Sequence, residues 1–180
     1  MRLHLLFPAA LLGLFLAAPA GAVDAVSLEF GAGEESAQRF GVGARWDWDS
    51  RWFTDGTWHL GGYWEAGASH WRGDESPDGN DSITEVGVTP VFRLQPHAPS
   101  GGIRPYLELG IGAHLFSARS LGDKEFGTAL NFGSHLGAGV RFGAREQFEL
   151  DYRFQHLSNA GLEDPNLGIN FHLLRFTYRY

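Results

Sequence analysis

Two residue types that can perform nucleophilic chemistry lie close together near the C-terminus, in the stretch FQHLSNAG. His156 and Ser158 are two residues apart, and residues at that spacing share one face of a β-strand. Their separation along a strand is about two rises of roughly 3.4 Å, so a serine hydroxyl could reach an imidazole. A neighbouring base is what activates a serine as a nucleophile. The spacing is therefore compatible with serine-based catalysis.

A simpler interpretation is that a strand ends at Gln155 and that His156 and Ser158 begin a polar loop. An isolated H-x-S pattern is a weak signal, because short motifs occur by chance without a supporting context. On spacing alone, the loop interpretation is the better one, and the surrounding elements must decide.

The residues before His156 alternate between apolar and polar types with a period of two, which is typical of a strand. The even-numbered members are Phe148, Leu150, Tyr152 and Phe154, and the odd-numbered members are Glu149, Asp151, Arg153 and Gln155. If the strand continues, His156 and Ser158 inherit the apolar face. Polar groups on a lipid-facing surface are costly unless they lie near the interface or serve a function.

The same alternation recurs along the chain and predicts eight strands of about the length that a tilted membrane-crossing strand needs. The polar faces combine many glycines with charged residues, which suits the narrow interior of a small membrane barrel better than a solvated surface. The fold class predicted is all-β, an eight-stranded antiparallel transmembrane β-barrel. The predicted strands fall within 27–32, 38–49, 57–68, 84–94, 103–116, 131–142, 148–156 and 170–180.

Composition supports this class and excludes others. The chain has 25 glycines and 14% aromatic residues, a combination typical of a curved barrel with aromatic girdles. Cysteine is absent, so neither a disulfide framework nor a thiolate metal site can form. A net charge of −7 without a basic cluster argues against nucleic acid as a partner.

The N-terminus indicates export. Residues 1–22 combine a basic start, an apolar run and a small-residue A-x-A pattern, as in a secretory signal peptide. A membrane anchor is the competing interpretation, but the apolar run is short and Pro8 interrupts it. Residues 23–180 would then form the barrel domain in the bacterial outer membrane. The tight turn at 143–146 and the long polar connections at 72–81 and 117–130 predict that both termini lie in the periplasm.

The stretch HLSNAGLEDPNLGIN, residues 156–170, resembles the lipid A 3-O-deacylase (PagL-type) family of outer-membrane esterases. The resemblance implies an active site on the outer wall of the barrel, at the outer leaflet. It implies hydrolysis of the ester-linked 3-hydroxyacyl chain at position 3 of lipid A in lipopolysaccharide, without a metal or cofactor. The matching histidine and serine of the family act as base and nucleophile, which assigns these roles to His156 and Ser158.

An oxyanion would need fixed hydrogen-bond donors near the serine. Candidates are the backbone N–H groups around Asn159 to Gly161 and the side-chain amide of Asn166. These same residues are also those that form tight turns, because Asn and Gly tolerate positive φ.

The chain departs from the family where some members have a glutamate fourteen residues beyond the histidine, because that position is Asn170. Asparagine can orient an imidazole but cannot stabilise imidazolium by charge. Three interpretations remain, in order: Asn170 is the orienting member, Glu163 or Asp164 supplies the carboxylate, or the protein is a silent relative. His172 is interpreted as an interfacial residue rather than a second base.

The alternative function is a non-catalytic eight-stranded outer-membrane barrel for adhesion or envelope integrity. A channel is disfavoured because side chains fill a barrel of this size. The partners expected are lipopolysaccharide and membrane lipid, and a homodimer is left open. The odd-numbered charges are expected to form an interior salt-bridge network rather than a proton relay: Glu149, Asp151, Arg153, Arg175 and Arg179.

Overall fold

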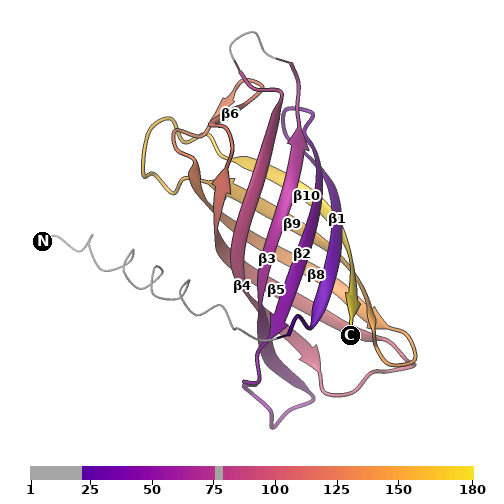
Figure 1. Ribbon diagram of the computed structural model, residues 1–180. Helices are drawn as coiled ribbons and strands as arrows, with labels where there is room; N and C mark the ends of the chain where they lie inside the picture. The colour runs from indigo at the N-terminus through magenta and orange to yellow at the C-terminus, as the bar shows by residue number, and fades with distance from the viewer. Residues whose placement is uncertain (1–21, 76–78) are drawn as a thin grey trace, which may run out of the picture.

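The computed structural model describes residues 22–75 and 79–180, which form a closed antiparallel barrel. The predicted eight-stranded barrel is confirmed, with the strand order β1-β10-β9-β8-β5-β4-β3-β2 (Figure 1). The predicted signal peptide lies outside the described residues, except for Ala22. The barrel strands are β1 Ala25–Gly33, β2 Gln38–Asp47, β3 Trp58–Arg72, β4 Ser82–Pro96, β5 Arg104–Phe116, β8 Leu130–Phe142, β9 Phe148–Ser158 and β10 Ile169–Arg179.

No helix within the described ranges is long and apolar enough to cross a membrane.

The two faces of each strand separate as the alternation predicts. In β9 the odd-numbered residues are buried, whereas Leu150, Tyr152 and Phe154 are exposed. The outer wall is apolar on the other strands as well, and Leu136 of β8 is 63% exposed. Monomeric soluble proteins rarely expose an apolar surface of this extent to water, so this belt indicates that lipid surrounds the barrel.

Buried charges fill the middle of the barrel, and the predicted interior salt-bridge network is confirmed. Glu108 accepts hydrogen bonds from Arg153 Nε at 2.7 Å, Arg93 Nη2 at 2.9 Å and Arg175 Nη2 at 3.0 Å. A second carboxylate, Glu149, forms ion pairs with Arg93 and Arg45. The network satisfies charges that would otherwise be costly to bury, and it crosslinks strands that are distant in sequence.

One end of the barrel interior differs from the polar lumen that the sequence predicted. A compact apolar core closes the lumen there, with Trp71 packed against Phe116 and Phe171 at ring-centroid distances of 4.9 and 4.8 Å. The connection 117–130, predicted to be only a polar loop, contains a small hairpin, β6 Ser120–Leu121 and β7 Lys124–Glu125. Leu121 and Phe126 from this connection are fully buried in the core. The sequence analysis did not identify Leu121 and Phe126 as core residues, because most of the residues around them are polar.

The three connections that the sequence singled out, 72–81, 117–130 and 143–146, divide between the two ends as expected, although the long connection 48–57 shares the end of the tight turn. The link between β8 and β9 is tight, with Glu146 N donating to Gly143 O at 3.0 Å and Gly143 at φ 96°. The hairpin β6–β7 and the loop between β9 and β10 lie at the opposite end, away from the C-terminus (Figure 1). The apolar core and these loops therefore surround the C-terminal end of β9, where His156 and Ser158 lie.

Candidate active site

Strand β9 continues through Ser158, so the interpretation that it ends at Gln155 is wrong. Two inward side chains explain why. Leu157, between the two candidate residues, and Ile169 on β10 are both fully buried in the apolar core. A shift of one residue would expose these side chains, so their burial sets the register and turns His156 and Ser158 outward.

His156 lies opposite Asn170 on the neighbouring strand. The two residues are direct register partners of β9 and β10, and His156 Nδ1 lies 2.8 Å from Asn170 Oδ1. An amide oxygen only accepts hydrogen bonds, so the imidazole must donate from Nδ1. The other ring nitrogen, Nε2, is then the acceptor. Both residues and Ser158 are half-buried, which leaves the group accessible from the outer wall.

A carboxylate that the sequence did not indicate lies behind Asn170. Glu34, in the turn after β1, accepts from Asn170 N at 3.1 Å and from Asn170 Nδ2 at 3.3 Å. Lys124 of β7 donates to Glu34 Oε2 at 2.7 Å and to Gly168 O at 3.1 Å. The hydrogen bond from Lys124 lowers the pKa of the Glu34 carboxyl below its ordinary value, so Glu34 is ionised at neutral pH.

The serine side chain is confined by a glycine. Gly168 has φ 63°, and a Cβ added there would lie 2.9 Å from His156 Cε1 and 3.3 Å from Ser158 Cβ. The backbone of Gly168 therefore packs directly against both candidate residues, where a side chain would collide with the ring. Ser158 Oγ forms no hydrogen bond with His156 in the described part of the chain. Contacts of this kind are commonly loose before substrate binds.

A second serine lies beside the histidine on the other side. Ser134 of β8 is the register partner of His156, and it shares the outward, half-buried face. Sequence reasoning did not single it out, because Ser134 and His156 lie in different strands and only their pairing brings them together.

Asn159 organises the loop that follows Ser158. Its buried side chain donates to Phe126 O at 2.8 Å and Glu163 O at 2.6 Å, and it accepts from Gly161 N at 2.8 Å. The backbone N–H of Asn159 donates to Asn166 Oδ1 at 2.9 Å. The N–H groups of Asn159 and Gly161 are thus engaged within the loop, whereas Asn166 Nδ2 has no acceptor among residues 22–75 and 79–180.

The two loop carboxylates lie apart from the imidazole. Glu163 and Asp164 are exposed, and within the described residues neither side chain forms a hydrogen bond or ion pair with His156. His172 lies on the outer wall, and its Nδ1 contacts the hydroxyl of Tyr152 at 2.5 Å. Of the residues proposed to orient the histidine, the structure brings only Asn170 into contact with it.

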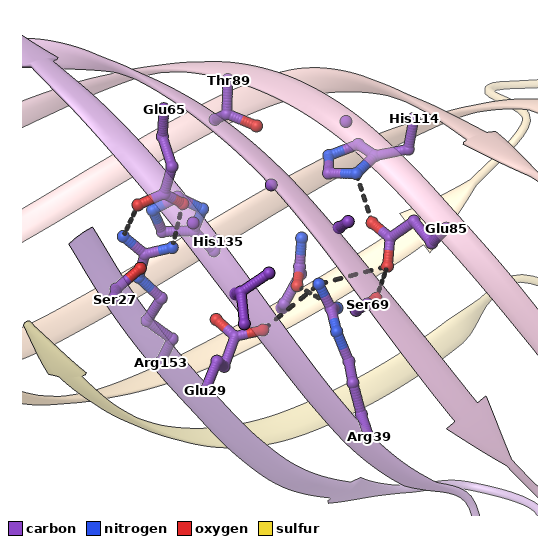
Figure 2. A pocket seen from close by; sticks show the side chains of 16 residues that line it. Ser27, Glu29, Arg39, Glu65, Ser69, Glu85, Thr89, His114, His135 and Arg153 are labelled. Atoms are coloured by element: carbon purple, nitrogen blue, oxygen red, sulfur yellow. Dashed lines mark hydrogen bonds and ion pairs between the residues drawn. The ribbon is translucent and has the colours of Figure 1, made fainter. Parts of the chain in front are cut away.

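A rival serine–histidine–carboxylate group lies inside the barrel (Figure 2). Ser69 Oγ donates to Glu85 Oε2 at 2.6 Å, and His114 Nδ1 contacts the other oxygen of the same carboxylate. Both groups contact Glu85 rather than each other, so His114 is not placed to take the proton of Ser69. The space for water there is about 40 Å³. That volume has room for only a few water molecules, which is too little for an acyl ester.

No group of three or more His, Asp or Glu side chains among the described residues could hold a metal ion.

Comparison with known proteins gives consistent matches. The family model "Lipid A 3-O-deacylase (PagL)" matches residues 38–179. "Lipid A deacylase PagL" from Pseudomonas aeruginosa is 36% identical over 157 residues, covering 87% of this chain and 86% of that protein. The protein of the same description from Bordetella bronchiseptica is 36% identical over 113 residues, covering 63% of this chain and 59% of that protein. The solved "Crystal structure of the outer membrane enzyme PagL" has a TM-score of 0.77 and 34% identity, covering 87% of this chain and 99% of that one.

Proposed function

The chain belongs to the lipid A 3-O-deacylase (PagL) family, and from this premise we propose that His156 and Ser158 form its catalytic pair on the outer wall of the barrel. The protein is a hydrolase of the outer membrane that removes an acyl chain from lipid A. This replaces the alternative of a non-catalytic barrel. The observation that carries the proposal is the His156–Asn170 hydrogen bond beside Ser158, on an apolar outer face.

The proposed reaction is acyl transfer through the serine. His156 Nε2 takes the proton of Ser158 Oγ, and the oxygen attacks the carbonyl carbon of the ester. The bond between that carbon and the sugar oxygen at position 3 breaks, and the imidazolium returns the proton to the sugar oxygen. Water, deprotonated in turn by His156, then attacks the carbonyl carbon of the acyl-enzyme. The bond from that carbon to Ser158 Oγ breaks, the imidazolium returns the proton to Oγ, and the 3-hydroxy fatty acid is released.

The developing oxyanion needs donors that the loop does not already use. Asn166 Nδ2 is one such group, because Asn166 uses only its oxygen to accept from Asn159. The N–H of Ala160 is another, since it makes no hydrogen bond within the described residues. We assign the oxyanion to these two donors, with Asn159 and Gly161 holding the loop that presents them.

The location of the pair fits a substrate that never leaves the membrane. Lipid A carries its ester-linked chains in the outer leaflet, and both candidate side chains project from the outer wall at one end of β9. We infer that this end faces outward from the cell, with the termini on the periplasmic side, as barrels with short periplasmic turns are oriented.

Ser158→Ala tests the proposal. Purified wild type and variant are incubated with lipopolysaccharide in detergent, and released 3-hydroxy fatty acid is measured by mass spectrometry. We expect the variant to lose at least about a thousandfold in rate, as when other serine nucleophiles are removed. Ser134→Ala, which removes a hydroxyl from the other side of His156, should stay active.

Equal release by wild type and Ser158→Ala would reject Ser158 as the nucleophile. Loss of activity in Ser134→Ala alone would move the nucleophile to β8. In both cases, folding of the variant is checked first by comparing the gel mobility of heated and unheated samples. A folding defect is then not mistaken for a loss of catalytic activity.

A further inference from the structure

We infer that Glu34 is a positioning residue for this reaction, acting on the histidine through Asn170. The inference rests on the proposed function and explains how a chain with asparagine at the third position could keep a working base. Glu34 belongs to none of the segments that suggested the catalytic pair, and it lies 136 residues from Asn170 in sequence.

Glu34 and Asn170 are joined by three hydrogen bonds. Asn170 N donates to Glu34 Oε2 at 3.1 Å, and Asn170 Nδ2 donates to Glu34 Oε1 at 3.3 Å. In return, Glu34 N donates to Asn170 O at 3.2 Å, extending the pairing of β1 and β10 past Gly33. The carboxylate thus contacts the backbone and the side chain of Asn170 at once.

These contacts determine which way the Asn170 amide faces. An ionised carboxylate only accepts hydrogen bonds, so Asn170 must turn its NH₂ group toward Glu34. The amide oxygen then faces His156, which must donate from Nδ1. This leaves Nε2 unprotonated, as a general base requires.

Without the carboxylate, the amide of Asn170 could rotate by half a turn. Its NH₂ group would then face His156 Nδ1 and favour the tautomer that carries its proton on Nε2. That tautomer cannot take a proton from Ser158, and a wrong tautomer is highly damaging in serine catalysis. Glu34 therefore prevents a non-productive arrangement rather than contacting the reacting atoms.

Lys124 holds Glu34 in place and also limits what Glu34 can contribute. Its ammonium group donates to Glu34 Oε2 at 2.7 Å and to Gly168 O at 3.1 Å. The Glu34 side chain is 42% exposed, so its negative charge is both neutralised by Lys124 and screened by water. We therefore expect the effect of Glu34 on rate to come from orientation and to be moderate.

The test compares Glu34→Gln in two backgrounds, wild type and Asn170→Glu. A glutamine has one donor end, so it cannot accept both hydrogen bonds from Asn170. We expect kcat to fall about tenfold in the wild-type background, with KM changed less than about twofold. In the Asn170→Glu background a carboxylate contacts His156 directly. Glu34 still accepts from the backbone N of residue 170, but it repels the new carboxylate and no longer orients an amide. There Glu34→Gln should leave kcat unchanged or raise it.

Two further variants test whether the carboxylate group itself is needed and whether the effect is specific to Glu34. Glu34→Asp keeps an acceptor-only carboxylate and should retain more activity than Glu34→Gln. Glu125→Gln is the matched control, since Glu125 is exposed beside Lys124 and its side chain forms no ion pair with a described residue. It should behave as wild type.

A merely structural role for Glu34 would lower kcat equally in both backgrounds, and that result overturns the inference. So does a Glu34→Gln variant as active as Glu125→Gln. Failure of the proposed function is seen separately, because Ser158→Ala would then be as active as wild type whatever Glu34 does.

Discussion

Glycine at position 168 brings the loop backbone against the proposed catalytic pair, His156 and Ser158. Its φ of 63° lies in the left-handed region that favours glycine, and the space for a Cβ is taken by the edge of the His156 ring. The carbonyl of the same residue accepts from Lys124 Nζ. Gly168 thus connects the ring, the serine and the ammonium group that anchors Glu34.

Gly168→Ala should lower kcat about tenfold or more, because the added methyl must displace the imidazole or the loop, and displacements of this size are expensive in catalysis. The measurement is release of 3-hydroxy fatty acid by the folded variant. Gly161→Ala is the control, because a Cβ at Gly161 meets nothing within 4 Å although its φ is also positive. Equal losses in the two variants would attribute the effect to backbone strain rather than to contact with the ring.

Asparagine at position 170 separates two tasks that one carboxylate performs in a serine triad. The orienting task is retained, since Asn170 Oδ1 accepts from His156 at 2.8 Å. The charge-stabilising task is not, because an amide is neutral and the nearest carboxylate, Glu34, is paired with Lys124. If His156 is the base, as proposed, we expect a slower base step with Asn170 than with a glutamate at this position.

At the scale of elements, the loop between β9 and β10 depends on one buried side chain. Within the loop, the Asn159 side chain contacts Gly161 N and Glu163 O. It also contacts Phe126 O in the connection that carries the β6–β7 hairpin. The carbonyl of Phe126, which is buried, would lose this hydrogen bond if the amide were removed, which costs about 1 kcal/mol.

Asn159→Ala is expected to loosen residues 159–168 and to lower activity at least about tenfold, while the barrel stays folded. Hydrogen exchange followed by mass spectrometry should show faster exchange in that loop and unchanged exchange in β3 and β4. Asn80→Ala is the control: it removes an exposed amide that donates to Ser120 Oγ of the β6–β7 hairpin but, within the described residues, forms no hydrogen bond with residues 159–168, and it should leave exchange in that loop unchanged. Unchanged exchange in the Asn159→Ala loop would contradict the assigned role.

The apolar core of the lumen holds β9 and β10, the two strands that carry the site, in place. Leu157 and Ile169 project into the apolar core that Leu121 and Phe126 complete from the connection between β5 and β8. Burying each such side chain contributes about 1.5–3 kcal/mol. The apolar end of the lumen therefore keeps the outward residues of β9 and β10 in register at the rim, where strand ends usually fray.

At the scale of the whole molecule, the proposed catalytic pair and the ionic network lie on opposite sides of the barrel wall. The ionic network in the lumen joins strands that are far apart, as when Arg175 of β10 contacts Glu65 of β3. The proposed catalytic pair lies outside, and none of its described hydrogen bonds reaches the network. Changes in the lumen should thus affect unfolding more than chemistry.

Glu108→Gln is expected to lower the free energy of unfolding by about 3–5 kcal/mol, because three arginines would lose a buried carboxylate partner. Urea unfolding in detergent or lipid measures the change, and Asp49→Asn, an exposed carboxylate, is the control. Activity per folded molecule should stay within about twofold of wild type, since the site is remote from the network. A large loss of activity without a change in stability would contradict this separation.

The sequence by itself determined whatever depends on local periodicity. The two-residue repeat of a strand is set by backbone geometry, so the alternation through Phe154 predicted an outward position for His156 and Ser158 on the condition that the strand continues past Gln155. The recurring alternation likewise predicted eight strands, and the glycines and charges of the polar faces predicted the interior of a small membrane barrel. The resemblance in residues 156–170 identified the family, because it lies in one continuous stretch.

Only the tertiary structure decided what meets across strands and loops. Closing the barrel pairs β1 with β10 and so brings Glu34 to Asn170, while the β6–β7 hairpin brings Lys124 to both Glu34 and Gly168. Neither Glu34 nor Lys124 could be recognised from the sequence. A charged residue in a connection between strands has the same local sequence pattern whether or not it contacts a distant residue. Long-range contacts follow from closure and register, which are properties of the assembled barrel rather than of any one segment.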